Sequence, residues 1–296
     1  MSGFQSLSAH ATLADRLYSA MQAVHWRNTG VLIILLIGAI FMLLPFLWMF
    51  SASMRPAAEA YQLPPSFFPK RINLESYREL LNSPVPFLRM YWNSLVVASV
   101  TTVVVIFTSA MAAFAFSRLR MPGSNTLFVV LLAGLMVPPA MLIIPLFFGI
   151  AWAGLHNTLW AIIVPGLANP LAILMMRSFM QSQSRAYEEA AFIDGASYWT
   201  IFWRISLPQM GPPIAALAII VFTTSWNNFL LPLVFARSPE VMTLPIGMIA
   251  ISNVTMGVEL SVLMSAVTLA LLPLTIVFIV AQRFIVESIA STGIKG

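Results

Sequence analysis

The chain has 296 residues, of which 59% are hydrophobic and 8% are charged, and its mean hydropathy is +0.89. Since a soluble domain carries about 25% charged residues, this composition indicates a protein that uses lipid as part of its solvent. The net charge of +5 comes from 15 basic and 10 acidic residues that are scattered along the chain. This excludes a basic nucleic-acid-binding surface, and the absence of cysteine excludes disulfides, thiolate metal sites and a cysteine nucleophile.

Six apolar segments are long enough to cross a bilayer, which requires about 20 helical residues. None contains Lys, Arg, Asp or Glu, and they cover residues 31–54, 93–116, 126–152, 158–176, 212–235 and 260–282. We therefore predict an all-α integral membrane protein with six transmembrane helices. Its predicted parts are a cytosolic N-terminal arm (1–30), the first transmembrane helix with an outer loop (31–92), a five-helix core (93–284) and a cytosolic C-terminal tail (285–296).

The basic residues set the predicted orientation, because short loops rich in Lys and Arg stay in the cytosol. With both termini inside (N-in/C-in), nine of the 15 basic residues lie on the cytosolic side. Five of the other six lie in one outer loop, residues 53–90, which is the main argument against this orientation.

The N-terminal arm and the first outer loop have different patterns. Apolar residues at helical spacing in the arm, from Leu7 to Val24, fit either an amphipathic helix on the inner membrane surface or a partly ordered cytosolic tail. The outer loop is rich in proline, which predicts a fixed, extended path, with one short helix at 74–81.

Prolines also interrupt the third and fourth spans. The interruptions are Pro138, Pro139 and Pro145 in the third span and Pro165, Gly166 and Pro170 in the fourth. These residues must kink or break their helices. Irregular backbone at membrane depth survives only beside protein or a water-filled cavity, so the breaks fit a translocation path as well as ordinary kinked packing.

The inner segment between the fourth and fifth spans, residues 184–208, has an unusual pattern. It contains Glu-Ala-Ala at 189–191, then Gly195, and nine residues later Ile-Ser-Leu-Pro at 205–208. Small residues allow another protein to approach closely, and glycine takes positive φ without steric cost. Pro208 suits the first turn of a helix. Since a simple connection would need none of these, we predict a docking surface that transmits force.

Neutral polar and aromatic residues within the spans are candidates for a translocation path. Together with the prolines of the third span, the candidate residues are Asn93, Pro138, Pro139, Asn169, Trp226, Asn227, Asn228 and Phe229. Amides donate and accept hydrogen bonds, and aromatic faces pack on the C–H faces of sugar rings, so the set suits an uncharged polyol. The alternative, which we favour for Asn93, is that the amides bridge neighbouring helices.

The chain shows no energy source of its own. The spans hold no ionisable group of the kind that proton- or sodium-driven carriers place in the membrane. Its only lysines, Lys70 and Lys295, are not part of a phosphate-binding Gly-Lys-Ser/Thr pattern. If the protein pumps, the energy must come from another subunit.

The pattern in residues 189–208 closely resembles the EAA signature of permease subunits of bacterial binding-protein-dependent ABC importers. Further stretches resemble the carbohydrate-uptake branch, close to the maltose-type second permease: 93–98 (NSLVVA), 116–123 (FSRLRMPG), 226–229 (WNNF) and 293–296 (GIKG). The resemblance extends over nearly the whole chain from Val31. One departure is Asn228, where the branch often has an acidic residue.

The resemblance implies a coupling helix around 184–191, a turn at Gly195 and a second short helix through 198–204. Glu189 would meet a basic residue of an ATPase subunit, and Phe192, Trp199, Phe202 and Ile205 would anchor the segment. The implied coupling residues are Glu188, Glu189, Ala190, Ala191, Asp194, Gly195, Ile205, Leu207 and Pro208.

The resemblance also implies the assembly around this chain. It comprises two ABC ATPase subunits that bind ATP and Mg²⁺, a second related permease and an extracytoplasmic substrate-binding protein, in the bacterial inner membrane. The chain itself would be multi-pass, would need no cofactor or metal and would not be an enzyme. The expected function is import of a sugar or polyol derivative by alternating access.

Other functions remain open at this point. Within the same class, the chain could serve a glycerol-phosphate or amino-acid importer, although an anionic substrate would favour Arg or Lys along the path. A stand-alone secondary carrier or channel would transport without an ATPase. A membrane assembly or scaffold protein would tolerate loss of the small residues in 184–208.

Overall fold

The computed structural model describes residues 26–56, 59, 67–254 and 260–292 of the chain. Every regular element in these ranges is helical, as the composition predicts. The elements are α2 (Trp26–Ser53), α4 (Glu75–Asn82), α5 (Phe87–Arg118), α6 (Ser124–Ala133), η1 (Gly134–Met136), η2 (Pro139–Leu142), α7 (Ile143–Trp152), α8 (Leu159–Gly166), α9 (Pro170–Ser182), α10 (Ala186–Ile193), α11 (Tyr198–Ile201), η3 (Phe202–Ser206), α12 (Leu207–Gln209), α13 (Gly211–Trp226), α14 (Leu230–Phe235), α15 (Leu244–Val254) and α16 (Leu260–Thr292).

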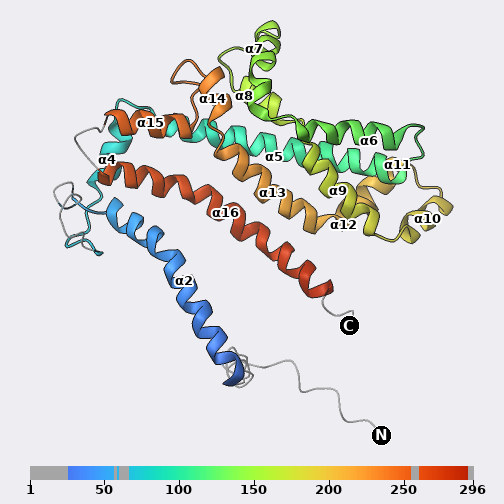
Figure 1. Cartoon of the computed structure of the whole chain (residues 1–296), viewed down its shortest axis with the longest axis horizontal. Helices are drawn as coiled ribbons and strands as arrows, with labels where there is room; N and C mark the ends of the chain where they lie inside the picture. Colours follow the sequence, from blue (N-terminus) through green and yellow to red (C-terminus); the bar gives the residue numbers. More distant parts are fainter. Residues whose placement is uncertain (1–25, 57–58, 60–66, 255–259, 293–296) are drawn as a thin grey trace.

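Helix α5 is the structural axis of the molecule. Its 32 residues make it about 48 Å long, more than the roughly 30 Å of a bilayer's hydrocarbon core. It packs against α8, α9, α13 and α15 (Figure 1). Small buried residues such as Ala98, Ala110 and Ala113 allow this close approach of neighbouring helices.

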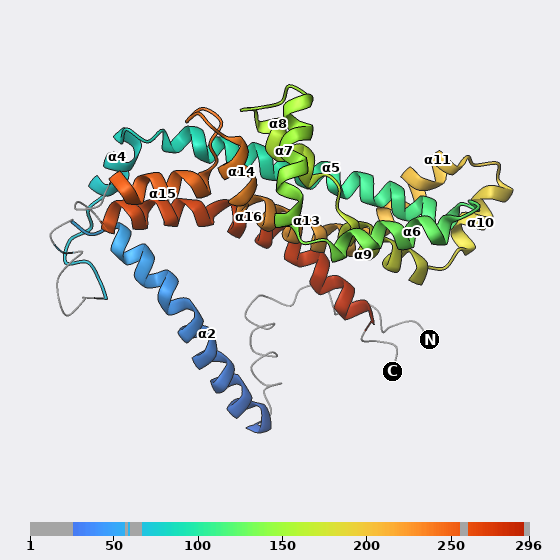
Figure 2. The same ribbon diagram turned by 45° about the horizontal axis from the view of Figure 1, so that its top comes forward.

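The two ends of the bundle carry different connections. Helices α4 and α15 lie at one end of α5, whereas α10 and α11 lie at the opposite end (Figures 1 and 2). Separate groups of buried side chains stabilise the two ends. One includes Leu80, Met90 and Leu244 near α4 and α15, and the other includes Met180, Ile201 and Phe202 near α11. The segment 184–208 therefore lies at the end remote from the first outer loop.

Four helical spans in the described part of the chain are long and apolar enough to cross a membrane on their own, and one of them, Gly211–Phe235, contains a short interruption at 227–229 between α13 and α14. They are Thr29–Ser53, Phe87–Arg118, Gly211–Phe235 and Leu260–Phe284. Two bent pairs bring the number to as many as six: Ser124–Met136 with Pro139–Trp152, and Leu159–Gly166 with Pro170–Ser182. These elements coincide with the six predicted segments.

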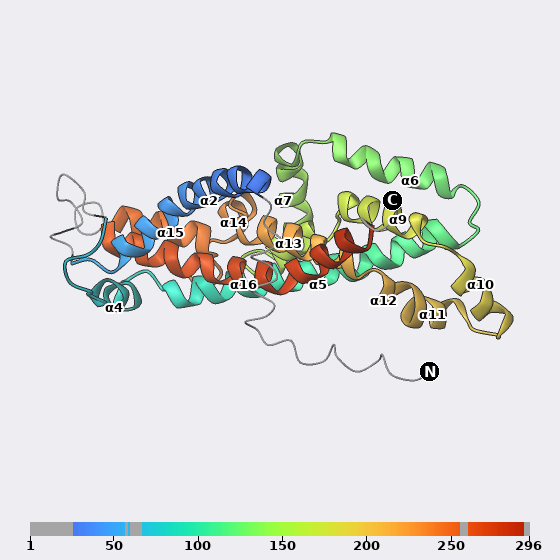
Figure 3. The ribbon, with the colours of Figure 1, turned by 90° about the horizontal axis from the view of Figure 1, so that it is seen from below.

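The predicted proline breaks are confirmed at Pro138–Pro139 and before Pro170, whereas Pro145 and Pro165 lie within α7 and α8. The pair joined before Pro139 bends by 95°, and the pair joined before Pro170 bends by 42°. Val137 has φ −86° and ψ 117°, the extended conformation that a following proline imposes. The larger bend carries α7 away from α6, as Figure 3 shows.

Helix α2 stands largely apart from the others. It contacts α16, and Ser51, Ala52 and Ser53 at its C-terminal end are buried. Most of its length projects away from the bundle (Figure 2), so side chains such as Ile34 and Phe41 remain exposed. Their apolar character fits contact with lipid or with another membrane subunit.

Several boundaries differ from the sequence prediction. The connection between the fifth and sixth predicted spans contains α15, an 11-residue helix that is too short to meet a transmembrane length criterion. Its Gly247 lies directly against the Met90 side chain, so a Cβ atom there would require the Met90 sulfur to move. Helix α16 continues to Thr292, beyond the predicted span 260–282. The short helix predicted at 74–81 is present as α4, whereas most of the predicted N-terminal arm lies outside the described residues.

Candidate functional site

The candidate site is the helix–turn–helix formed by α10, α11, η3 and α12. Helix α10 ends in a turn at Gly195, whose φ is +80°. The Gly195 N–H donates to the Phe192 carbonyl (3.0 Å) and the Ala196 N–H to the Ala191 carbonyl (2.9 Å). This hydrogen-bond pattern is a Schellman motif, which requires the left-handed conformation that glycine adopts at little cost. The predicted sharp turn at Gly195 is confirmed.

The second helix of the site is longer than predicted. Ser197 caps α11 by accepting a hydrogen bond from the Thr200 N–H (3.2 Å), and helical structure then continues without a loop to Gln209. The prediction ended this helix at 204. The intervening η3 is a π-helix that ends two residues before Pro208. Proline has no N–H, so Pro208 cannot donate a hydrogen bond to the carbonyl four residues back.

A buried ionic cluster joins this loop to the end of α5. The Arg118 Nε lies 2.6 Å from Oε2 and 2.8 Å from Oε1 of Glu188. The Ser206 hydroxyl donates a hydrogen bond of 3.0 Å to Glu188 Oε1. Next to this cluster, Arg185 donates to the Ser117 carbonyl (2.7 Å). The carboxylate therefore connects α5, α10 and η3.

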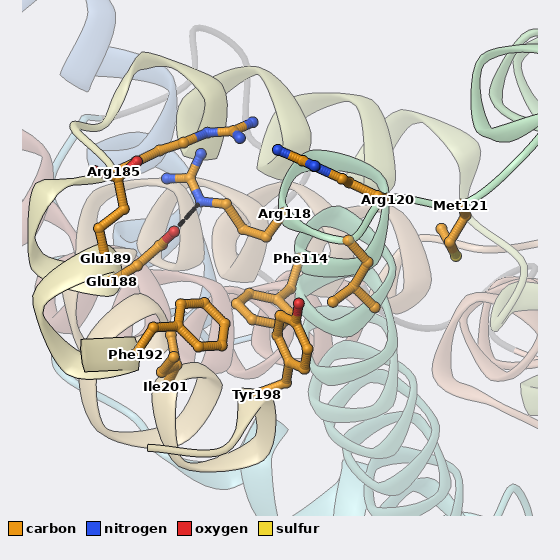
Figure 4. Close-up of a pocket in the computed structure, with 11 residues that line it drawn as sticks. Phe114, Arg118, Arg120, Met121, Arg185, Glu188, Glu189, Phe192, Tyr198 and Ile201 are labelled. Atoms are coloured by element: carbon orange, nitrogen blue, oxygen red, sulfur yellow. Dashed lines mark hydrogen bonds and ion pairs between the residues drawn. The ribbon is translucent and has the colours of Figure 1, made fainter. Parts of the chain in front are cut away.

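A cavity of about 560 Å³ opens beside the cluster. Arg118, Arg120 and Arg185 line one side, and Phe192 and Tyr198 line another. Figure 4 shows that the three arginine side chains extend toward the same region of the cavity. The Phe192 and Tyr198 rings meet edge to face with centroids 4.8 Å apart, which closes the angle between α10 and α11.

The loop presents several large hydrophobic side chains on its outer surface. Ile193 is 88% exposed and Trp199 57% exposed. Tyr187, Tyr198 and Trp203 are exposed as well. Phe202 instead is only 2% exposed and packs edge to face on Phe114. The anchor residues implied by the resemblance thus divide into two groups. Phe202 and the half-buried Ile205 pack on the chain's own core, whereas Phe192 and Trp199 are exposed.

The remaining coupling residues also divide by exposure. Glu189, Ala190, Asp194 and Pro208 are exposed, whereas Ala191, Ile205 and Leu207 are half-buried. Glu188, one of the expected coupling residues, is 7% exposed and faces its own chain. The structure therefore places the two adjacent glutamates in different environments.

A second, smaller cavity of about 180 Å³ lies where two spans are interrupted. Asn169 caps α9 by accepting from the Ala172 N–H (3.0 Å), and Asn228 accepts from the Leu231 N–H (3.2 Å) at the start of α14. Both residues line the cavity, together with Thr101 and Ser225. Thr101 is 4% exposed, and its Oγ1 has no hydrogen-bond partner among the described residues.

The other predicted path residues do not line this cavity. Trp226 is 3% exposed and stacks on Phe222. The Asn227 amide donates to the Thr223 carbonyl (3.0 Å). Phe229, Pro138 and Pro139 are exposed at breaks in their spans. Of the eight candidates, Asn169 and Asn228 are brought together here.

At the opposite end of the bundle, polar side chains hold the segment between α14 and α15. The Asn93 amide donates to the Glu240 and Met242 carbonyls, both at 2.8 Å, so Asn93 has a structural contact, but with the connection before α15 and not with a neighbouring helix. Ser94 Oγ accepts from the Leu244 N–H (2.7 Å). A hydrogen bond from the Ser238 side chain, with smaller contributions from a backbone hydrogen bond and the Arg89 charge, lowers the pKa of the Glu240 carboxyl.

Sequence reasoning missed Asn157, which also holds this segment. Its φ is +54°, and its Oδ1 accepts from the backbone N–H groups of Arg237 (2.9 Å) and Ser238 (3.1 Å). It missed Arg118 and Ser206 as well. Arg118 was visible within the FSRLRMPG stretch, but nothing in the sequence paired it with Glu188.

Among the described residues, no group of three or more His, Cys, Asp or Glu could hold a metal ion.

Comparison with known proteins adds a sequence relationship to this geometry. Residues 105–291 match the family described as binding-protein-dependent transport system inner membrane component. The chain is 32% identical to the arabinooligosaccharides transport system permease protein of Halalkalibacterium halodurans, over 85% of this chain and 91% of that protein. It is 29% identical to the diacetylchitobiose uptake system permease protein of Streptomyces coelicolor, over 96% of this chain and 91% of that protein.

A solved structure has a similar fold. It is a bacterial ABC transporter involved in the import of the acidic polysaccharide alginate, with a TM-score of 0.73 and 23% sequence identity. The similarity covers 93% of this chain and 99% of that chain.

Proposed function

The chain belongs to the family of binding-protein-dependent transport system inner membrane components, and on this basis we propose that it is the permease subunit of an ATP-driven importer for a sugar or a sugar or polyol derivative. It is a multi-pass protein of the bacterial inner membrane. The permeases of similar sequence are named for arabinooligosaccharide and diacetylchitobiose transport, which supports a carbohydrate substrate here.

The importer would contain four further components. Two ABC ATPase subunits would bind ATP and Mg²⁺, a second related permease would complete the pore, and an external binding protein would deliver the substrate. The exposed apolar surface of α2 and the exposed face of α6, including Val129 and Val130, would contact lipid or the second permease. The binding protein would dock near α4 and the segment between α14 and α15.

The observation that carries this proposal is the exposed surface of α10 and α11. Large hydrophobic side chains such as Ile193 and Trp199 project from a rigid helix–turn–helix at one end of the bundle. A permanently solvated loop would gain nothing from them, whereas buried aromatic anchors dominate the energy of protein interfaces. This surface would receive the movement of an ATPase subunit, with Glu189 meeting a basic residue of that subunit.

The cavity at Asn169 and Asn228 would form part of the translocation path. The oxygen of each amide is used in a helix cap, so the amide NH₂ groups can donate to a substrate. Thr101 Oγ1 supplies a hydroxyl that both donates and accepts. No Lys, Arg, Asp or Glu lines this cavity, which suits the uncharged hydroxyl groups of a sugar. Alternating access would open it to each side in turn.

The proposal is tested by purifying the complex through an affinity tag on this chain and reconstituting it in liposomes. We expect ATPase subunits and a second permease to co-elute. Radiolabelled arabinooligosaccharide and diacetylchitobiose would be supplied with the binding protein encoded with this chain. ATP-dependent accumulation of either sugar supports the proposal. Accumulation by the isolated chain without an ATPase would overturn it in favour of a secondary carrier.

A further inference from the structure

Two neighbouring glutamates in α10 face different surroundings. Glu189 is exposed, whereas the Glu188 side chain is 9% exposed and forms an ion pair with Arg118, whose side chain is 5% exposed. A carboxylate removed from water to this degree requires both charge compensation and hydrogen bonds. Arg118 and Ser206 supply them. Glu188 is therefore committed to its own chain and does not belong to a partner-binding surface.

The position of each group in its helix favours this arrangement. Arg118 is the last residue of α5, where the helix dipole favours a positive charge. Glu188 lies in the first turn of α10, where the dipole favours a negative charge. Arg118 also donates to the Gln183 carbonyl (3.4 Å), directly before the α10 segment. The ionic pair thus fixes both the start of α10 and its distance from α5.

The elements joined at Glu188 lead to the second cavity. Helix α5 carries Thr101, which lines that cavity. Ser206 lies in η3, and the chain continues through α12 into α13, which carries Thr224 and Ser225, also in the cavity wall. Of the helices that approach the cavity from this end, α5 and α13 are therefore connected to α10 through one carboxylate, whereas α9 is joined to α10 by the chain itself.

We propose that Arg118 and Glu188 act as a positioning pair that makes α10, the end of α5 and η3 move as one body. A displacement of α10 would then reach α5 and α13 together and alter the cavity between them. Without the pair, α10 could shift against α5, and part of the work done by the ATPase would not reach the cavity. This inference rests on the proposed function and assigns Glu188 a role different from that of Glu189.

The test measures sugar uptake and ATP hydrolysis in the same proteoliposomes, which contain the full complex. Glu188→Gln keeps the shape of the side chain and removes its charge. We expect the number of sugar molecules taken up per ATP hydrolysed to fall about tenfold. A tenfold change corresponds to the free energy of about one charge-assisted hydrogen bond. The amount of ATPase subunit that co-purifies should stay the same, because the Glu188 side chain is not exposed to the partner.

Glu189→Gln is the matched control, since it makes the same chemical change one residue away on the exposed surface. We expect it to reduce co-purification of the ATPase and to leave the uptake per ATP of the remaining complexes unchanged. If both variants lower the same quantity, the two glutamates share one role and the positioning inference is wrong.

A second variant covers the case in which Glu188→Gln does not assemble. Ser206→Ala removes one hydrogen bond to Glu188 and leaves the ion pair with Arg118 in place, so we expect a smaller loss of uptake per ATP. If uptake per ATP hydrolysed is unchanged in every variant that assembles, while the unmodified complex transports normally, the positioning role is wrong but the proposed function stands. Absence of ATP-driven uptake by the unmodified complex would instead refute the proposed function.

Discussion

Asn169 and Asn228 begin the second halves of two different interrupted spans, and both line the same cavity of about 180 Å³. Each side chain uses its oxygen to cap the helix that follows it. This satisfies backbone N–H groups that the interruption would otherwise leave unpaired in the membrane. The same two residues therefore permit the breaks and place polar groups in the cavity that the breaks create.

Replacing Asn169 or Asn228 with serine should weaken sugar uptake more than it destabilises the protein. Serine is also a good N-cap, so the helix start is retained, but the amide NH₂ donor is lost. We expect the KM for sugar uptake to rise by up to about tenfold per residue, the value for one neutral hydrogen bond. Initial rates of uptake in proteoliposomes provide the measurement.

Asn227→Ser is the control for this pair, because Asn227 lies next to Asn228 but not in the cavity wall. It should leave KM unchanged. An equal effect of all three substitutions would indicate a general loss of helix stability and would remove the cavity from the transport path.

Gly195→Val should leave the protein inserted in the membrane and abolish ATP-driven uptake. A Cβ atom added at Gly195 meets no atom within 4 Å, but the φ of +80° is unfavourable for a branched residue. The turn must then rearrange and change the angle between α10 and α11. Uptake by the reconstituted complex tests this expectation, and Gly195→Asn, which tolerates positive φ better, should retain more activity than Gly195→Val.

The sequence predicted the elements of this fold better than the contacts between them. Apolar segments without charges identified the spans, and prolines identified the bends in the third and fourth spans, because these depend on local chemistry. No proline marks the interruption at 227–229 between α13 and α14. The pairing of Arg118 with Glu188 joins residues 70 positions apart, and no local pattern specifies it. Trp226 illustrates the same limit, since an aromatic residue in a span suits a sugar ring and a neighbouring Phe222 equally well.

Trp199 and Phe202 should respond differently to replacement with alanine, although both were implied as anchors of the loop. Phe202 is 2% exposed, so Phe202→Ala should lower stability by about 3–5 kcal/mol, the usual cost of removing a buried aromatic ring. Trp199 is 57% exposed, so Trp199→Ala should leave stability nearly unchanged and reduce ATPase binding.

Thermal unfolding of the purified chain in detergent and co-purification of the ATPase distinguish these two effects. A loss of stability in Trp199→Ala as large as that in Phe202→Ala would show that Trp199 is part of the internal packing and not of the partner surface.

Asn157→Ala should loosen the segment between α14 and α15. The substitution removes two hydrogen bonds accepted from the backbone and one donated to the Ser238 hydroxyl, with an expected loss of about 1–3 kcal/mol. Asn157→Gly keeps the positive φ accessible, so the difference between the variants separates backbone strain from hydrogen bonding. Thermal unfolding measures both effects. If Asn157→Ala unfolds at the same temperature as the unmodified chain, the Asn157 side chain does not have this role.

Labelling of single cysteines should place α10 in the cytosol and the segment after α14 outside. The chain has no cysteine, so Asp194→Cys and Glu240→Cys, both at exposed positions, each introduce one reactive group without background.

The distribution of basic residues supports this orientation. The end that carries α10 also carries Arg118, Arg120, Arg185 and Arg204, as expected of a cytosolic end. At the other end Arg55 is 1% exposed and hydrogen-bonded to Ser51, so one of the basic residues in 53–90 is buried and has a structural role.

We expect a membrane-impermeant maleimide to label Glu240→Cys in intact spheroplasts and Asp194→Cys only after permeabilisation. The reverse pattern would mean that α10 cannot meet a cytosolic ATPase, and the coupling surface would have to be abandoned.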